Sequence, residues 1–145
     1  MLQTPSLYVP TAAVSRSAAD ALIQAAIKSA SDLGIDISVA IVDAGGATKA
    51  FSRTDGAAFL TVDAAVNKAW SAASFGYPTH TWNEYMSDPK LAPLSNLPRM
   101  LPVGGGYPLF AEGRLVGGIG ISGGSYAQDQ DIAAAALLAV GFSLR

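Results

Sequence analysis

Lys68, His80 and Glu84 are the side chains of this sequence best suited to proton transfer. Lys68 is the one charge in the middle of an alanine-rich helix face, so covering that face would lower the pKa of its amine. An amine of lowered pKa can act as a base, form a Schiff base or bind an anion. His80 is the only imidazole, and Glu84 follows it on the same short helical segment. These three residues are the candidate catalytic residues.

Two of these side chains also have a purely structural explanation. Lys68 could extend to solvent along its apolar stem, or pair with Asp63, Asp129 or Asp131. His80 lies in a proline-flanked loop, where most polar side chains only face water. The residues alone leave both explanations open.

The absence of cysteine and the single histidine restrict the metal chemistry. Without cysteine, disulfides, iron–sulfur sites and thiol nucleophiles are excluded. Most protein zinc sites need several His or Cys ligands, so we expect none here. One imidazole is enough for axial ligation of a haem iron, and His80 is therefore the candidate metal ligand if haem is bound.

A second group of residues could bind a ligand. Arg53 and Asp55 follow a predicted hairpin and could hold a ligand carboxylate or form a local ion pair. Trp82 and Tyr85 lie close to His80 and could line a pocket for a planar ligand, or only cover the core. We count all four as candidate ligand-binding residues.

A glycine-rich segment precedes the last predicted helix. Gly118-x-Gly120-x-x-Gly123 matches a dinucleotide-binding pattern, but the sequence after it holds one helix and neither the further strand nor the acidic residue such a unit needs. Close strand packing explains the glycines better. Gly123, Gly124 and Ser125 could still bind a small anion through free N–H groups at the helix start.

Hydrophobic periodicity predicts the elements that position these residues. A helix capped by Ser15 or Ser17 ends near Gly34, and the last helix begins with the capping box Ser125-x-x-Gln128. Between them we expect strands at 35–43 and 47–53, a helix at 59–75, a crossover of brief helices at 76–102, and strands at 107–111 and 115–122. The order α-ββ-α-ββ-α predicts an α+β fold with an antiparallel sheet flanked by helices.

The helix at 59–75 has two contrasting faces. We expect it to pack twice, once on the sheet and once on another element or subunit. The larger apolar residues on one face are Phe59, Val62, Val66, Trp70 and Ala73, and the small face holds Ala64, Ala65, Lys68, Ser71 and Ala72.

Composition bounds the remaining expectations. The 145 residues fit a single domain, 1–145, with residues 1–14 as an arm lying over it. A net charge of −2 without basic clusters argues against nucleic acid. No basic segment precedes an apolar run and no apolar stretch could span a bilayer, so we expect a cytoplasmic protein without membrane contact. With only 14% charged residues, the surface favours self-association into a homo-oligomer.

Three segments together resemble the GlcG/HbpS family, which includes the C-terminal domain of PduO. They are IDISVAIVDAGGATKAFSRTDGA, VNKAWSAASF and LPVGGGYPLFAEGRLVGGIGISGGSYAQDQDIAAAA, and the similarity extends over about residues 17–142. The resemblance implies a profilin-like or PAS-like α+β domain that forms homodimers or larger rings. The residues matching the shared motif are Arg53, Asp55, Lys68, Gly105, Gly106, Gly120, Gly123, Gln128 and Asp129.

The resemblance also implies binding of haem or a corrinoid-related ligand. This chain has no histidine on its first predicted helix, so haem binding would depend on His80 or on a non-histidine ligand. The segment YPTHTWNEYMSDPK is the most individual part of the sequence, and we expect it to decide ligand choice.

Three functions are compatible with these residues. The first is a small-ligand binding protein, with haem as the named ligand. The second is a cofactor-independent enzyme that catalyses proton transfer, hydration, isomerisation or cyclisation of a small carbonyl or carboxylate compound. The third is a structural or partner-binding module without a ligand.

Overall fold

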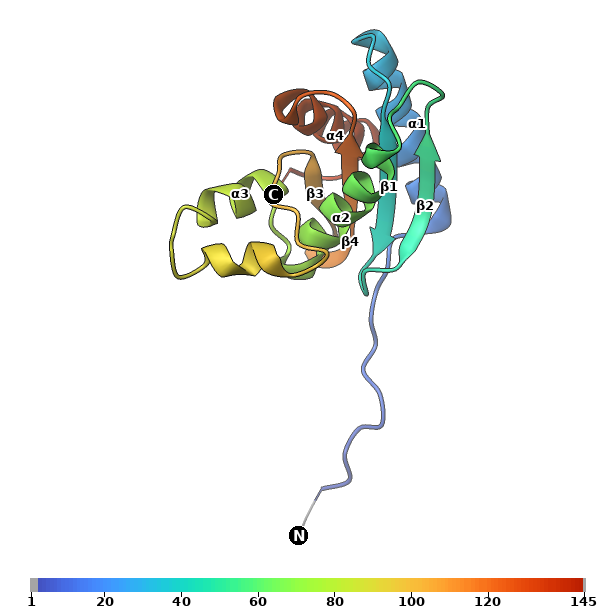
Figure 1. The fold of residues 1–145 in the computed structure, drawn as a ribbon. Coiled ribbons are helices and arrows are strands. Elements are labelled where there is room, and N and C mark those ends of the chain that lie inside the picture. The colour runs from blue at the N-terminus through green and yellow to red at the C-terminus, as the bar shows by residue number, and fades with distance from the viewer. Residues whose placement is uncertain (1–2, 145) are drawn as a thin grey trace.

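The structure is a computed structural model that describes residues 3–144, so residues 1–2 of the predicted arm and residue 145 lie outside it. Four antiparallel strands form one sheet in the order β2-β1-β4-β3, flanked by helices on both faces (Figure 1). The predicted α+β fold and the order of its main elements are confirmed. The elements are α1 Arg16–Asp32, β1 Ser38–Asp43, β2 Thr48–Arg53, α2 Leu60–Phe75, α3 Thr79–Tyr85, η1 Ala92–Asn96, β3 Gly106–Ala111, β4 Arg114–Ser122 and α4 Tyr126–Val140.

The sheet separates two apolar layers of unequal size. Val39 and Ile41 of β1 face the larger layer, which α1 and α4 cover. Ala40 and Val42 alternate with them and face α2 on the other side. Successive side chains of a strand point to opposite faces, and both layers are apolar, so β1 is buried on both sides.

Helix α2 lies close to the sheet because the contacting residues are small. A Cβ atom on Gly118 would collide with the backbone oxygen of Ala69, and one on Gly120 with the backbone oxygen of Ala65. Gly118 and Gly120 therefore permit close helix–sheet packing, whereas the sequence pattern predicts close packing of strands at these positions. The helix begins at Leu60, one residue later than expected.

Of the two faces of α2, the larger one is mostly uncovered within the described chain, so its packing on another subunit stays a prediction. Phe59, just before the helix, is 86% exposed, and Val66 and Trp70 are only half-buried. The buried side is the small one, with Ala65 and Lys68 among its members. The small face packs on the sheet because α2 approaches the glycines of β4 too closely for bulky side chains to fit at the contact.

The helix ends behave as the sequence predicts. The Ser15 hydroxyl accepts a hydrogen bond from the N–H of Ala18 and caps α1. Ser125 and Gln128 form both hydrogen bonds of the capping box at the start of α4. Helix α2 ends at Gly76, which adopts a left-handed conformation with φ 75°.

The crossover and the arm are the two segments outside the layers. Helix α3 and the 3-10 helix η1 form a small lobe beside α2, as expected for 76–102 (Figure 1). The arm differs from its prediction, because residues 3–13 extend away from the domain and lie mostly exposed. It joins the fold at Val14, whose N–H donates to the carbonyl of Val116. Too few of its apolar side chains meet their own domain to hold it there.

Within residues 3–144, no helix combines the length and the apolar character that crossing a bilayer requires.

Candidate functional site

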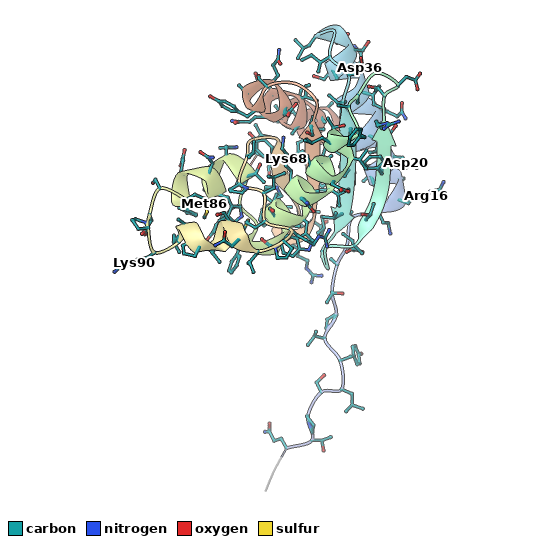
Figure 2. The ribbon with its side chains drawn as sticks, in the orientation of Figure 1. Arg16, Asp20, Asp36, Lys68, Met86 and Lys90 are labelled. Atoms are coloured by element: carbon teal, nitrogen blue, oxygen red, sulfur yellow. The ribbon has the colours of Figure 1, made fainter. Side chains whose placement is uncertain are left out.

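Lys68 lies near the centre of the molecule, under the start of α4, whereas Lys90 lies at the tip of the crossover lobe (Figure 2). Its Nζ atom is 3.1 Å from Oδ2 of Asp129 and donates to the carbonyl of Ile121 at 2.9 Å. Both side chains of the ion pair are almost completely buried. Of the acidic partners that the sequence left open, the structure selects Asp129.

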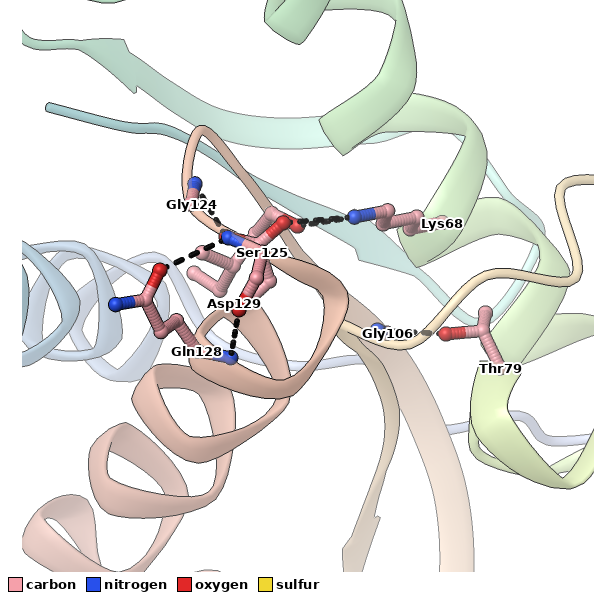
Figure 3. A network of polar contacts seen from close by, with 8 residues as sticks. Lys68, Thr79, Gly106, Gly124, Ser125, Gln128 and Asp129 are labelled. Carbon is pink, nitrogen blue, oxygen red and sulfur yellow. Dashed lines mark hydrogen bonds and ion pairs between the residues drawn. The ribbon is translucent and has the colours of Figure 1, made fainter. Parts of the chain in front are cut away.

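Asp129 lies in the first turn of α4, and its carboxylate is directed back to the glycine-rich turn that precedes the helix (Figure 3). The N–H of Gly124 donates to Oδ1 of Asp129 at 2.8 Å, and the N–H of Gly123 also contacts this carboxylate. The N–H of Ser125 is taken by Oε1 of Gln128. The N–H groups of Gly123, Gly124 and Ser125, expected to bind an external anion, are thus directed to the chain's own Asp129 and Gln128 side chains.

Burial shifts the pKa values of both partners of the ion pair. Desolvation lowers the pKa of the Lys68 amine, and the nearby Asp129 carboxylate offsets part of this effect. Desolvation raises the pKa of Asp129, opposed by Lys68 and by the N–H groups of Gly124 and Gly123. The predicted lowering for a covered Lys68 is therefore confirmed, with the ammonium held as a fixed donor between two acceptors.

An open pocket of about 270 Å³ lies over this ion pair. We call it the Lys68 pocket. Its polar side chains come from three elements, α2, β4 and α4, and they are Lys68, Ser122 and Asp129. Its apolar walls are Leu60, Leu101, Val103 and Tyr126.

A second pocket of about 280 Å³ lies on the other side of Val103 and Tyr126, which line both. We call it the His80 pocket. His80 and Glu84 of α3 line it together, so the structure brings these two predicted residues to one cavity. Asn83, Gly104 and Gln130 complete its lining.

The His80 ring is fixed by packing on one side only. Its centroid lies 5.5 Å from that of Tyr107, with the rings at 62° to one another. Its Nδ1 atom is buried and has no hydrogen-bond partner within residues 3–144. Because Nδ1 is buried, Nε2 is the ring nitrogen left to bind a ligand.

Of the seven predicted ligand-binding residues, only Gly124 lines one of these two pockets. Trp82 is buried and donates its indole N–H to the carbonyl of Ser71, and Tyr85 packs edge-on against it. This aromatic group covers the end of α2, which is the structural explanation weighed for it. Arg53 and Asp55 are exposed at the end of β2.

Sequence reasoning missed Ser122, Val103 and Tyr126. Ser122 had a detectable signal, because strand alternation places it on the same face of β4 as Gly118 and Gly120, toward α2. Val103 and Tyr126 had none. They meet only because the loop before β3 and the start of α4 fold together.

Among residues 3–144, no three His, Asp or Glu side chains gather closely enough to hold a metal ion by themselves.

The fold and the pockets describe a small α+β domain with two open pockets beside the start of α4. Residues 14–138 match the family described as Haem degrading protein HbpS-like, and the chain belongs to this family. The resemblance to GlcG and HbpS drawn from the sequence is confirmed.

Curated relatives support the same assignment. The chain is 33% identical over 144 residues to the corrinoid adenosyltransferase PduO of Citrobacter freundii, covering 96% of this chain and 42% of PduO. It is 32% identical over 109 residues to the protein GlcG of Escherichia coli, covering 75% of this chain and 81% of GlcG. The chain thus spans less than half of the PduO relative's length.

Solved structures share the fold over nearly the whole chain. The PduOC haem complex is 34% identical with a TM-score of 0.86, covering 92% of this chain and 99% of that chain. HbpS is 30% identical with a TM-score of 0.89, covering 97% of this chain and 99% of that chain.

Proposed function

We propose that this protein binds haem, with His80 as the iron ligand. The carrying observation is that the single imidazole of the chain lines a pocket, and its buried Nδ1 leaves Nε2 as the nitrogen that could bind iron. The haem-bound state of the similar PduOC domain supports this choice of ligand. One histidine is sufficient for axial ligation of haem.

The residues of the His80 pocket fit one part of such a ligand. An imidazole nitrogen is a suitable axial donor, and Val103 and Tyr126 offer apolar surface to a flat macrocycle. Bound haem would supply the redox and oxygen chemistry of its iron, while the chain would bind and orient it. Nδ1 has no acceptor in residues 3–144, so no second residue would orient the imidazole toward the iron.

We propose that a second copy of the chain completes the site. The pocket holds about 280 Å³, below the about 300–1,000 Å³ typical of sites that enclose a drug-sized ligand. Its apolar lining is partly exposed, since Tyr126 is 68% and Val103 37% accessible. Assembly into a homo-oligomer, which the low content of charged residues also favours, would cover this lining. We propose that this oligomer is cytoplasmic.

The test is a haem titration followed by the Soret absorbance, with wild type beside His80→Ala. We expect saturable binding by wild type. In His80→Ala we expect a shifted Soret band and an affinity for haem at least about tenfold lower, because the iron loses its ligand from the protein. Thr81→Ala is the matched control, because Thr81 neighbours His80 but lines neither pocket. Absence of saturable binding by wild type, or an unchanged spectrum in His80→Ala, would contradict the proposal.

A further inference from the structure

We propose that the Lys68 pocket is a separate binding site for a small neutral carbonyl compound, whose oxygen accepts hydrogen bonds from Lys68 and Ser122. This site does not depend on haem binding at His80. It rests on two donors that the fold leaves available at the pocket surface.

The first available donor is the Ser122 hydroxyl. Ser122 is 6% exposed and lines the pocket. Its side chain has no hydrogen-bond partner within residues 3–144. The Ser122 oxygen is not sealed in the interior, so its hydroxyl is free to donate to a ligand in the pocket.

The second available donor is the third N–H of the Lys68 ammonium. An ammonium has three donors, and the described residues supply two acceptors, Asp129 and the carbonyl of Ile121. Lys68 belongs to α2 and Ser122 to the end of β4, and both line the same cavity. One ligand oxygen with two lone pairs can accept from both.

The charge balance of the pocket selects a neutral ligand. Lys68 is the only cation in its lining, and Asp129 already neutralises it at 3.1 Å. The N–H groups of Gly123 and Gly124 are also directed to Asp129. A carboxylate entering here would be buried beside Asp129 without an uncompensated positive charge, which is costly.

The walls select a compact apolar body for that ligand. Leu60, Leu101, Val103 and Tyr126 surround the donors with hydrocarbon and one aromatic ring. A ketone, lactone or lactam of five or six ring atoms presents one carbonyl oxygen on such a body.

The test uses 2-pyrrolidinone, a neutral lactam, as the probe for ¹H–¹⁵N NMR titration of the full chain. We expect saturable shifts of the amide signals of Leu101, Val103, Gly124 and Tyr126. Cyclopentanecarboxylate, an anion of similar shape, should bind more weakly. Ser122→Ala should reduce the affinity for the lactam roughly 2- to 10-fold, the effect of one neutral hydrogen bond.

The control variant is Ser95→Ala, which removes an exposed hydroxyl of η1 that bonds only to the carbonyl of Ala92. It should bind the lactam like wild type. Thermal unfolding of each variant separates loss of binding from loss of folding. The proposal is overturned if wild type shows no saturable shifts, if Ser122→Ala binds as well as wild type, or if the carboxylate binds better than the lactam.

Discussion

The ammonium of Lys68 and the carboxylate of Asp129 lie 3.1 Å apart, with side chains only 4% and 3% exposed. This contact joins α2 to α4 across the end of the sheet, and the Lys68 ammonium also reaches the carbonyl of Ile121 in β4. Three elements thus meet at one ion pair. Because charges are costly to bury, its position beneath a pocket suggests a role in function more than in stability.

Removing one partner of this pair should destabilise the protein strongly. Lys68→Met leaves the Asp129 carboxylate buried and unpaired, and we expect the free energy of unfolding to fall by about 3–5 kcal/mol. The variant Lys68→Met/Asp129→Asn should lose less than the sum of the single losses, because Asn keeps an acceptor for Gly124. Urea denaturation of wild type, Lys68→Met, Asp129→Asn and the double variant measures the coupling energy between the two residues. Additive losses of stability would contradict this coupling.

The same comparison should reveal a specific pH dependence. Because the pKa of Asp129 is raised, the folded protein binds this proton at a higher pH than the unfolded chain does. Stability therefore increases as pH falls from the raised pKa toward the ordinary value of 3.8. The lowered pKa of Lys68 means that stability also rises as pH increases toward 10.5.

Wild type measured against Lys68→Met/Asp129→Asn should therefore be relatively least stable between these two windows. Denaturation midpoints at several pH values on each side test this expectation. A relative maximum near neutral pH would instead show that the pair's attraction exceeds its desolvation cost.

Gly120→Ala should weaken the contact between α2 and β4. The new methyl group would meet the carbonyl of Ala65 and the N–H of Ala69, both backbone atoms that cannot move alone. We expect a loss of about 1–3 kcal/mol or more in the free energy of unfolding. Gly45→Ala is the control, because its methyl group would make only an ordinary contact at 3.5 Å and should change stability by less than about 0.5 kcal/mol.

Deleting residues 1–13 should change assembly and not folding. Leu7, Tyr8 and Val9 are 77–90% exposed on an arm that leaves the domain, as expected for a segment that packs on a neighbouring copy. The deletion keeps Val14 and its bond to Val116. Light scattering should show a smaller assembly with an unchanged far-UV spectrum. An assembly of unaltered mass would exclude the arm from subunit contacts.

Local signals in the sequence determined the elements of this protein. Strand alternation, the Ser15 cap, the Ser125–Gln128 capping box and Gly76 depend on neighbours within a few residues, so they can be recognised without tertiary structure. The family assignment rested on motifs of the same local kind. Lys68 could be recognised from the sequence because it is the lone charge on an alanine-rich helix face.

The tertiary structure decided which residues meet. The pairing of Lys68 with Asp129, rather than Asp63 or Asp131, depends on how α4 crosses the end of the sheet. The small face of α2 turned inward because the glycines of a distant strand leave no room for the large one. These outcomes depend on contacts between segments far apart in the chain. Local periodicity does not predict such contacts, because it reports only on residues close in sequence.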